Sequence, residues 1–226
     1  MTDAARGDAA ATRERRILGI ETSCDETSAA IVTGTSARMT LRSLVILSQD
    51  VHRLFGGVVP ELASRQHLVG IVPAVRAALA DAGLALTDLD AIAVTHAPGL
   101  VGALLVGTSY AKALGFASHV PVVPVHHLEG HLFATALEHP DATPPFTALL
   151  VSGGHTMLLD VPAWGTYRLL GQTRDDAAGE AFDKVAKLLG LPYPGGRPLE
   201  ELARTVPSSS MRFALPMVRK NAEPGD

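Results

Sequence analysis

One pattern occurs twice in this sequence, and the repetition constrains the fold more than any other feature. Apolar segments 16–21 and 27–32 flank a short polar turn, and segments 148–151 and 156–161 flank a second one. Two short apolar segments around a polar turn are typical of an antiparallel pair of strands. The sequence therefore predicts a chain made of two related halves, each of which begins with such a pair.

The first half continues with helices and strands in alternation. Apolar residues recur at helical spacing over 60–82, and the pattern ends at Gly83, a residue that commonly terminates helices. The expected order is βββαβαβ, which makes the protein α/β. The other elements expected here are a third strand at 41–48, a strand at 91–95, a helix up to about residue 117 and a strand at 122–125.

The second half repeats this beginning but is shorter. A third strand is expected at 167–172, followed by helices at 176–189 and 198–204. The strands that would complete this half have no sequence to form them, so we expect it to be truncated. The predicted organisation is a disordered leader at 1–16, a first subdomain at 17–145 that carries a metal-binding helix, and an incomplete second subdomain at 146–226.

Both polar turns offer hydroxyl groups and backbone N–H groups. Groups of this kind hold phosphate oxygens without requiring a specific side chain. Two such turns in two related halves predict a nucleotide cleft. The arrangement resembles the duplicated, ribonuclease H-like fold of actin, the sugar kinases and the Hsp70 ATPase.

Composition excludes some classes of protein. The longest apolar stretch, 100–106, is far shorter than the roughly 20 residues that span a bilayer, so we expect no membrane segment. The N-terminal segment lacks the apolar centre of a secretory signal, and the single cysteine, Cys24, fits a reducing compartment. We therefore expect a cytoplasmic protein. A net charge of −4 and 4% aromatic residues do not by themselves indicate nucleic-acid binding.

Two histidines predict a metal site. His127 and His131 are four residues apart, so on a helix they lie on one face and can hold one metal ion. Solvated or helix-capping histidines are the alternative, because this spacing also arises by chance in a chain with nine histidines.

Four long motifs occur in a fixed order along the chain. They are Gly19-Ile20-Glu21-Thr22-Ser23-Cys24-Asp25-Glu26-Thr27, His127-Leu128-Glu129-Gly130-His131, Leu150-Val151-Ser152-Gly153-Gly154-His155-Thr156 and Gly179-Glu180-Ala181-Phe182-Asp183-Lys184. Together they resemble the tRNA N6-adenosine threonylcarbamoyltransferase family, and the resemblance runs from about residue 17 to residue 219. Members of this family transfer a threonylcarbamoyl group from threonylcarbamoyl-adenylate to N6 of the adenosine beside the tRNA anticodon.

The resemblance implies roles for individual residues. His127 and His131 correspond to the family's histidine ligands of one ferrous iron, or alternatively zinc, per subunit. The family's aspartate ligand comes from a C-terminal segment that is not present here, so the site is incomplete as written. Asp183 and Gly196 correspond to nucleoside-contacting positions. The substrate-binding loop corresponds to Leu150, Val151, Ser152, Gly153 and Gly154.

The same resemblance implies partners. They are tRNA, threonylcarbamoyl-adenylate with its adenine nucleotide, a paralogous scaffold subunit and the small ATPase of the bacterial complex that performs this modification. Asp25 and Glu26, in the first polar turn, are our candidates for accepting a proton during the transfer. The alternative for these two carboxylates is a surface turn stabilised by an Asx hydrogen bond.

Other functions fit the sequence less well. A zinc protease of the zincin class places its glutamate directly after the first histidine, whereas Glu129 stands two residues after His127. A small-molecule kinase of the same fold has no need for the histidine pair, and scaffold paralogues lack it. An inactive, truncated fragment of the transferase is the remaining alternative.

Overall fold

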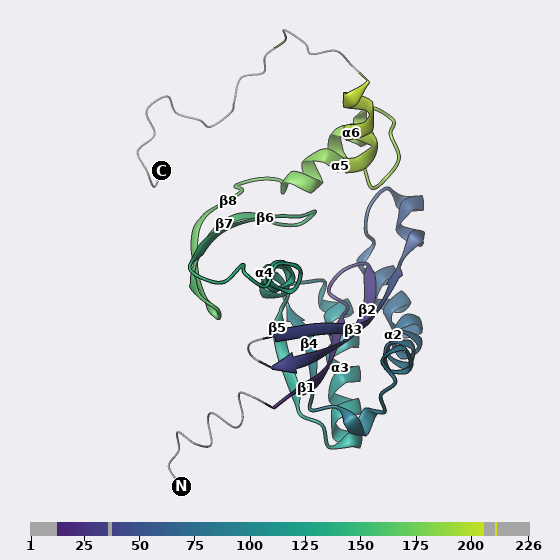
Figure 1. Ribbon diagram of the computed structural model, residues 1–226. Coiled ribbons are helices and arrows are strands. Elements are labelled where there is room, and N and C mark those ends of the chain that lie inside the picture. Colours follow the sequence, from purple (N-terminus) through teal and green to yellow (C-terminus); the bar gives the residue numbers. More distant parts are fainter. Residues whose placement is uncertain (1–12, 36–37, 206–210, 212–226) are drawn as a thin grey trace. The chain divides into compact units, whose positions relative to one another are not determined.

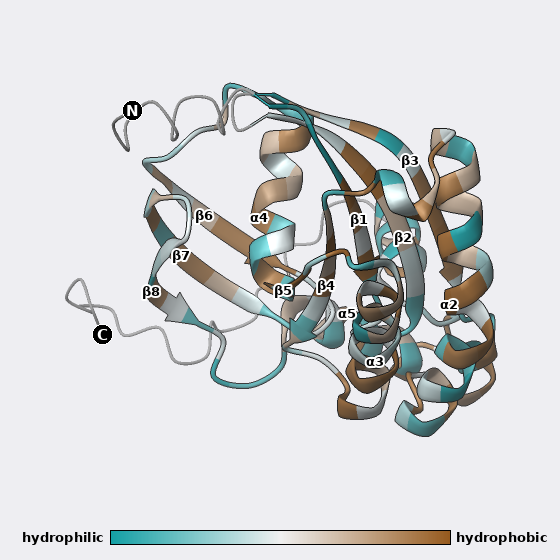
Figure 2. Ribbon diagram, turned by 90° about the horizontal axis from the view of Figure 1, so that it is seen from below, coloured by the Kyte–Doolittle hydropathy of each residue, from teal (hydrophilic) through white to brown (hydrophobic). Residues whose placement is uncertain are grey.

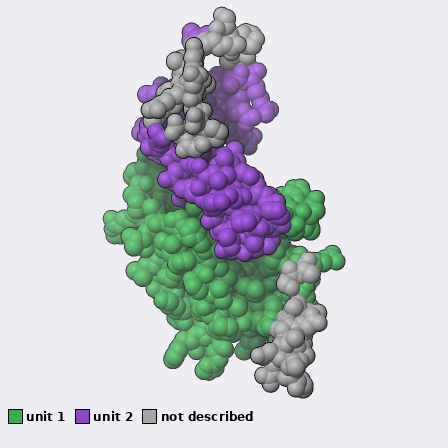
Figure 3. All heavy atoms as spheres, turned by 90° about the vertical axis from the view of Figure 1, so that its left-hand side faces the viewer, with its two compact units in different colours: residues 1–143 green, residues 144–226 purple. Residues whose placement is uncertain are grey.

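The computed structural model describes residues 13–35, 38–205 and 211. The chain divides into two compact units, 1–143 and 144–226, which Figure 3 distinguishes by colour. Each unit has its own sheet.

Unit 1 is built on a five-stranded mixed sheet with the order β3-β2-β1-β4-β5 (Figure 1). The three N-terminal strands are antiparallel neighbours, whereas β4 and β5 run parallel to β1. The carboxyl ends of β1, β4 and β5 therefore lie at one edge of the sheet. The strands are β1 (Arg15–Glu21), β2 (Glu26–Thr35), β3 (Arg38–Ser48), β4 (Ala91–Ala97) and β5 (Val122–His126).

Helices lie on both faces of this sheet, with α2 and α3 on one face and α4 on the other (Figure 2). Helix α2 begins with Pro60 and ends before Gly83, whose left-handed backbone (φ 66°) closes the last turn as predicted. The helical elements are η1 (Asp50–Phe55), α2 (Pro60–Ala82), η2 (Leu86–Asp88), α3 (Val101–Ser118) and α4 (His127–Glu138).

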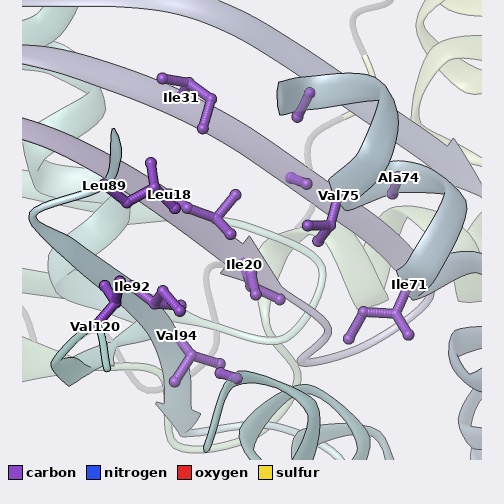
Figure 4. Packing of buried hydrophobic residues seen from close by; sticks show 13 residues of the cluster. Leu18, Ile20, Ile31, Ile71, Ala74, Val75, Leu89, Ile92, Val94 and Val120 are labelled. Carbon is purple, nitrogen blue, oxygen red and sulfur yellow. The ribbon is translucent and has the colours of Figure 1, made fainter. Parts of the chain in front are cut away.

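The core of unit 1 lies between the sheet and helices α2 and α3 (Figure 4). Alternate residues of a strand point to opposite faces, so Leu18 and Ile20 of β1 are buried on the helix side, with Ile92 of β4 beside them. Gly107 of α3 allows a close approach, because a methyl group there would collide with Thr22. The end of β1 is thus held tightly against α3.

Unit 2 begins in the same way as unit 1, with three antiparallel strands in the order β6-β7-β8. The predicted helix at 176–189 starts later, at Ala178, because the polar atoms of residues 173–176 bond within a turn, where the Thr173 hydroxyl donates to the Asp176 carbonyl. The elements are β6 (Phe146–Val151), β7 (Thr156–Ala163), β8 (Thr166–Gln172), α5 (Ala178–Leu188) and α6 (Gly196–Arg204).

The order of elements agrees with the prediction. Unit 1 has the βββαβαβ arrangement, and unit 2 repeats its three-stranded antiparallel beginning followed by a helix. The protein therefore has the mixed α/β, actin-like fold that the sequence predicted. None of the helices in the described residues is long and apolar enough to cross a membrane.

Candidate functional site

The histidine pair lies at the start of α4. Because β5 ends at His126 and the helix begins at once, His127 and His131 occupy the first and second turns, at the carboxyl edge of the sheet. Their Nε2 atoms are 3.1 Å apart, and the two rings meet at an interplanar angle of 82°. The predicted convergence of two imidazole nitrogens is therefore present.

The donor set fits a metal ion. Two nitrogen ligands at about 2.0–2.1 Å from a zinc ion lie about 2.9–3.4 Å apart, which includes the separation of the two Nε2 atoms. Imidazole nitrogen is a common ligand of both iron and zinc. Among the described residues, no group of three or more His, Cys, Asp or Glu side chains is arranged to hold a metal ion. Within the part of the chain that the structure describes, unit 1 offers two candidate nitrogen ligands, His127 and His131.

Glu21, which the sequence analysis did not select, lies directly against this pair. It is the last residue of β1, and its Oε2 atom is 3.2 Å from Nδ1 of His127. The Thr95 hydroxyl of the neighbouring strand β4 donates to the same oxygen at 2.6 Å, and the Ser23 backbone N–H donates to Oε1. Burial alone would raise the pKa of Glu21, but hydrogen bonds from His127, Ser23 and Thr95 outweigh it and lower the pKa to about 2.

The ionisation of Glu21 fixes the hydrogen-bonding role of His127. A carboxylate can only accept hydrogen bonds, so Nδ1 of His127 must carry the proton. The other nitrogen, Nε2, then presents a lone pair in the direction of His131. One signal in the sequence points to Glu21: polar residues at the carboxyl ends of parallel strands gather where ligands bind in open α/β sheets.

A depression of about 280 Å³ lies beside Glu21, on the sheet face that α4 partly covers. The residues that line it include Gly19 and Ala93 from adjacent strands and Gly130 of α4, which are all small and apolar. Glu21 and Thr95 supply polar groups at one end. The carboxylate therefore adjoins open space as well as a histidine.

The two candidate proton acceptors lie in the turn between β1 and β2. Asp25 is partly buried, and its carbonyl accepts a hydrogen bond from the Gln49 backbone N–H. Glu26 is exposed, and its carboxylate accepts a hydrogen bond from the Ser48 hydroxyl at 3.0 Å. These contacts leave the assignment of either residue as a general base a prediction.

Two polar groups at the start of the same turn are hydrogen-bonded within the protein. The Thr22 hydroxyl donates to the buried carbonyl of Ala103 at 2.9 Å, and the Ser23 N–H is bonded to Glu21. Ser23 is 3% exposed and Thr22 is fully buried. These two polar groups therefore bond within the protein, and phosphate binding by the turn that follows them stays a prediction.

Cys24, next in the chain, is exposed. Loss of solvent around the sulfur atom and the adjacent Asp25 carboxylate raise the pKa of its thiol to about 12. A thiol with this pKa stays protonated at neutral pH and is a poor nucleophile. Cys24 is therefore assigned no chemistry.

The corresponding turn of unit 2 is open. Gly153 and Gly154 are exposed, and a methyl group at either would meet no atom within 4 Å. The Ser152 hydroxyl shapes the turn by accepting the His155 backbone N–H at 3.0 Å. Of the predicted loop, Leu150 is 6% exposed and belongs to the core of unit 2, whereas Val151 is 53% exposed.

Asp183 and Gly196, the predicted nucleoside-contacting residues, belong to one local structure in unit 2. Asp183 lies on α5, and its carboxylate accepts the backbone N–H of Gly195 at 2.7 Å. Gly195 is buried against α5, where a methyl group would collide with Ala186. Gly196 follows as the first residue of α6. Asp183 therefore holds the backbone at Gly195, immediately before Gly196, in place against α5.

Comparison with known proteins identifies the family. The model of the tRNA N6-adenosine threonylcarbamoyltransferase family matches residues 40–224. The chain belongs to this family. A threonylcarbamoyltransferase from Gemmatimonas aurantiaca is 76% identical over 215 residues, which cover 93% of this chain. One from Moorella thermoacetica is 56% identical over 92% of the chain.

The chain spans about 60% of the length of these curated threonylcarbamoyltransferases. Among solved structures, an uncharacterised Pseudomonas aeruginosa protein with similarity to peptidase YeaZ has a TM-score of 0.46 and 22% identity, and covers 70% of this chain and 64% of its own. Component A of (R)-2-hydroxyglutaryl-CoA dehydratase from Acidaminococcus fermentans has a TM-score of 0.46 and 12% identity, with 91% and 62% covered.

Proposed function

We propose that this chain supplies the metal-binding and nucleotide-binding parts of a tRNA N6-adenosine threonylcarbamoyltransferase. The proposed reaction transfers the threonylcarbamoyl group from threonylcarbamoyl-adenylate to N6 of the adenosine adjacent to the anticodon, in tRNAs that read codons beginning with A. Family membership supports the reaction type. The observation that carries the proposal is the convergence of the His127 and His131 Nε2 atoms beside an ionised glutamate.

In this proposal His127 and His131 hold one ferrous iron or zinc ion. When bound, the ion would act as a Lewis acid and a template for the carbamoyl and phosphate oxygens. The role of the histidines is to present two neutral nitrogen ligands from a rigid helix end. Their fixed separation limits the reorganisation that binding requires.

The reaction needs alignment more than a strong base. The adenosine N6 atom attacks the carbamoyl carbon, the bond from that carbon to the phosphate oxygen breaks, adenylate leaves and N6 loses a proton. Asp25 or Glu26 is the proposed proton acceptor, because both carboxylates lie in the turn that follows Glu21.

Unit 2 is the proposed holder of the adenylate. The open turn at Ser152, Gly153 and Gly154 lets the backbone approach an acyl phosphate closely, since no side chain intervenes. Leu150 supports that turn from the core, and Val151 lies exposed beside it. Asp183 and Gly196 are the proposed contacts to the nucleoside.

The proposed partners are those that the family resemblance implies. They are tRNA, threonylcarbamoyl-adenylate, a paralogous scaffold subunit and a small ATPase. The proposed location of the reaction is the cytoplasm.

A chimera tests the proposed reaction. In the Gemmatimonas aurantiaca relative, the aligned segment of 215 residues is replaced by this chain. We expect the chimera to incorporate labelled threonine into unmodified tRNA when the adenylate-forming enzyme and partner proteins are supplied. The same chimera with His127→Ala should lose incorporation. A chimera that folds, binds tRNA and yet transfers nothing would contradict the proposal.

A further inference from the structure

Glu21 connects the sheet to the histidine pair through its contact with Nδ1 of His127. We propose that Glu21 is a positioning residue: its carboxylate fixes His127 in the Nδ1–H form and directs the Nε2 lone pair toward a metal ion shared with His131. This inference rests on the metal site of the proposed function. It concerns Glu21 itself, which is not a ligand in the proposal.

The first argument is the rigidity of the carboxylate. Both oxygens of Glu21 are engaged, Oε1 by the Ser23 N–H and Oε2 by the Thr95 hydroxyl and His127. Ser23 and Thr95 are 3% and 6% exposed, so these partners are held by the core rather than by solvent. The acceptor that faces His127 is therefore fixed in position.

The second argument is the place of Glu21 in the sheet. Strands β1 and β4 are parallel neighbours, and α4 follows β5, the next strand in the sheet. The ends of these strands bring Glu21 and Thr95 to the first turn of α4. Histidine ligands in metalloproteins commonly donate their second ring N–H to a carboxylate, which sets the tautomer and strengthens the ligand.

A purely structural role is the competing explanation. In that case Glu21 would only tie the end of β1 to β4 and α4, and its loss would lower stability without changing which nitrogen of His127 carries the proton. The Ser23 hydroxyl, 3.3 Å from Nδ1, offers an alternative acceptor. The carboxylate should dominate because hydrogen bonds to an ionised acceptor are roughly twice as strong as those between neutral groups.

Glu21→Gln separates these explanations. The Ser23 N–H still requires an acceptor at the Oε1 position, so the carboxamide NH₂ takes the place of Oε2 and faces Nδ1 of His127. Nδ1 must then accept, and the proton moves to Nε2, the nitrogen proposed to bind metal. Metal affinity should fall by about 10–100-fold, the usual effect of removing an outer partner of a histidine ligand.

Two measurements on the 226-residue chain test the inference. The first is long-range ¹H–¹⁵N NMR of ¹⁵N-histidine protein without metal, in which the His127 signals are assigned by comparison with His127→Ala. The second is the Zn²⁺ and Co²⁺ affinity, measured by competition with a chromophoric chelator. Glu61→Gln is the matched control, because Glu61 is exposed and pairs only with Arg65 in the next turn of α2 among the contacts described. Circular dichroism establishes that each variant is folded.

The expected result is an Nδ1-protonated His127 in the wild-type chain and in Glu61→Gln, and an Nε2-protonated His127 with at least a tenfold loss of metal affinity in Glu21→Gln. If Glu21→Gln fails to fold, Glu21→Asp serves instead, because it keeps the charge but withdraws the carboxylate by one methylene. It should weaken metal binding in the same direction.

The outcomes separate the inference from the proposed function. Unchanged tautomer and unchanged affinity in folded Glu21→Gln, with tight binding by the wild type, overturn the role of Glu21 alone. Absence of Zn²⁺ and Co²⁺ binding by the wild-type chain overturns the proposed metal site and the metal-directed part of this inference, while the tautomer measurement still decides whether Glu21 orients His127.

Discussion

The two polar turns occupy equivalent places in units 1 and 2, but they are built differently. After β1, Thr22 and Ser23 are buried and bond to protein atoms. After β6, Gly153 and Gly154 are exposed, with open space around each Cα. The first turn supports neighbouring side chains, whereas the second can be approached by a ligand. The two turns therefore share their place between antiparallel strands but differ in how much of their polar surface is open to solvent.

The largest expected effect is the loss of bound metal when His127 or His131 of unit 1 is replaced. In the chimera with the Gemmatimonas aurantiaca relative, His127→Ala and His131→Ala should each reduce bound iron or zinc from about one ion per chain to nearly none, because the site loses one of its two histidine ligands. Elemental analysis after purification measures this. Gly154→Val, in the other unit, is the control and should retain its metal. Full metal content in both histidine variants would refute the ligand assignment.

The second expected effect tests the open turn. Gly154→Val should weaken adenine-nucleotide binding by more than tenfold, because the side chain would occupy the space that a phosphate needs. Calorimetric titration with an adenine nucleotide measures the affinity. Gly171→Val is the matched control, since Gly171 of β8 also has no atom within 4 Å of an added methyl group. If Gly154→Val and Gly171→Val bound the adenine nucleotide with equal affinity, the turn would not be part of the nucleotide-binding site.

The third prediction tests the closed character of the first turn. Gly107→Ala should lower the free energy of unfolding by about 1–3 kcal/mol, because the new methyl group would collide with the buried Thr22 side chain. Gly130→Ala in α4 meets no neighbour within 4 Å and should instead add up to about 1 kcal/mol of helix stability. Urea denaturation of both variants measures the difference. Equal stabilities would mean that α3 does not clamp this turn.

The sequence predicted the elements well where the apolar period is regular. Helix α2 agrees with the prediction at both ends, because Pro60 and Gly83 mark them. Strand β2 is longer than predicted, since pairing with β3 continues to Thr35 beyond the apolar segment. Helix α5 begins two residues late, because residues 173–176 form a turn in which the Thr173 hydroxyl donates to the Asp176 carbonyl.

The candidate site was predicted only in part, for a physical reason. The His127–His131 contact is set by the helical repeat alone, so four residues of sequence suffice to predict it. The Glu21–His127 contact spans 106 positions and depends on the strand order β1-β4-β5, which local patterns do not determine. The hydrogen bonds that close the first turn are also long-range, since Thr22 bonds to Ala103.

The smallest predicted effect concerns the segment that supports the first turn from α2. His67 is fully buried, and its Nε2 atom lies 2.9 Å from the Cys24 carbonyl while Nδ1 lies 2.8 Å from the Thr27 hydroxyl. Since a carbonyl only accepts, Nε2 donates and Nδ1 accepts from Thr27. The neutral ring thus ties α2 to both ends of the Cys24–Glu26 turn.

This arrangement makes the stability of unit 1 depend on pH. Burial lowers the pKa of His67 below its ordinary value of 6.5, because the charged imidazolium is poorly solvated there. The unfolded chain therefore binds a proton more readily than the folded one. The contribution of His67 is complete above pH 6.5, decreases as the pH falls below it by at most about 1.4 kcal/mol per pH unit, and stops changing below the lowered pKa.

Urea denaturation between pH 5 and pH 8, a range of about one to two units on either side of an ordinary histidine pKa, measures this dependence. His67→Gln is the informative variant, because a glutamine amide can still donate to the Cys24 carbonyl but does not titrate. The variant should be less stable at pH 8 and lose less stability on acidification than the wild type. If the free energy of unfolding changed equally with pH in both proteins, His67 would not be the titrating group. The hydrogen bonds of Thr22 and Ser23 would then be what holds the first turn in place.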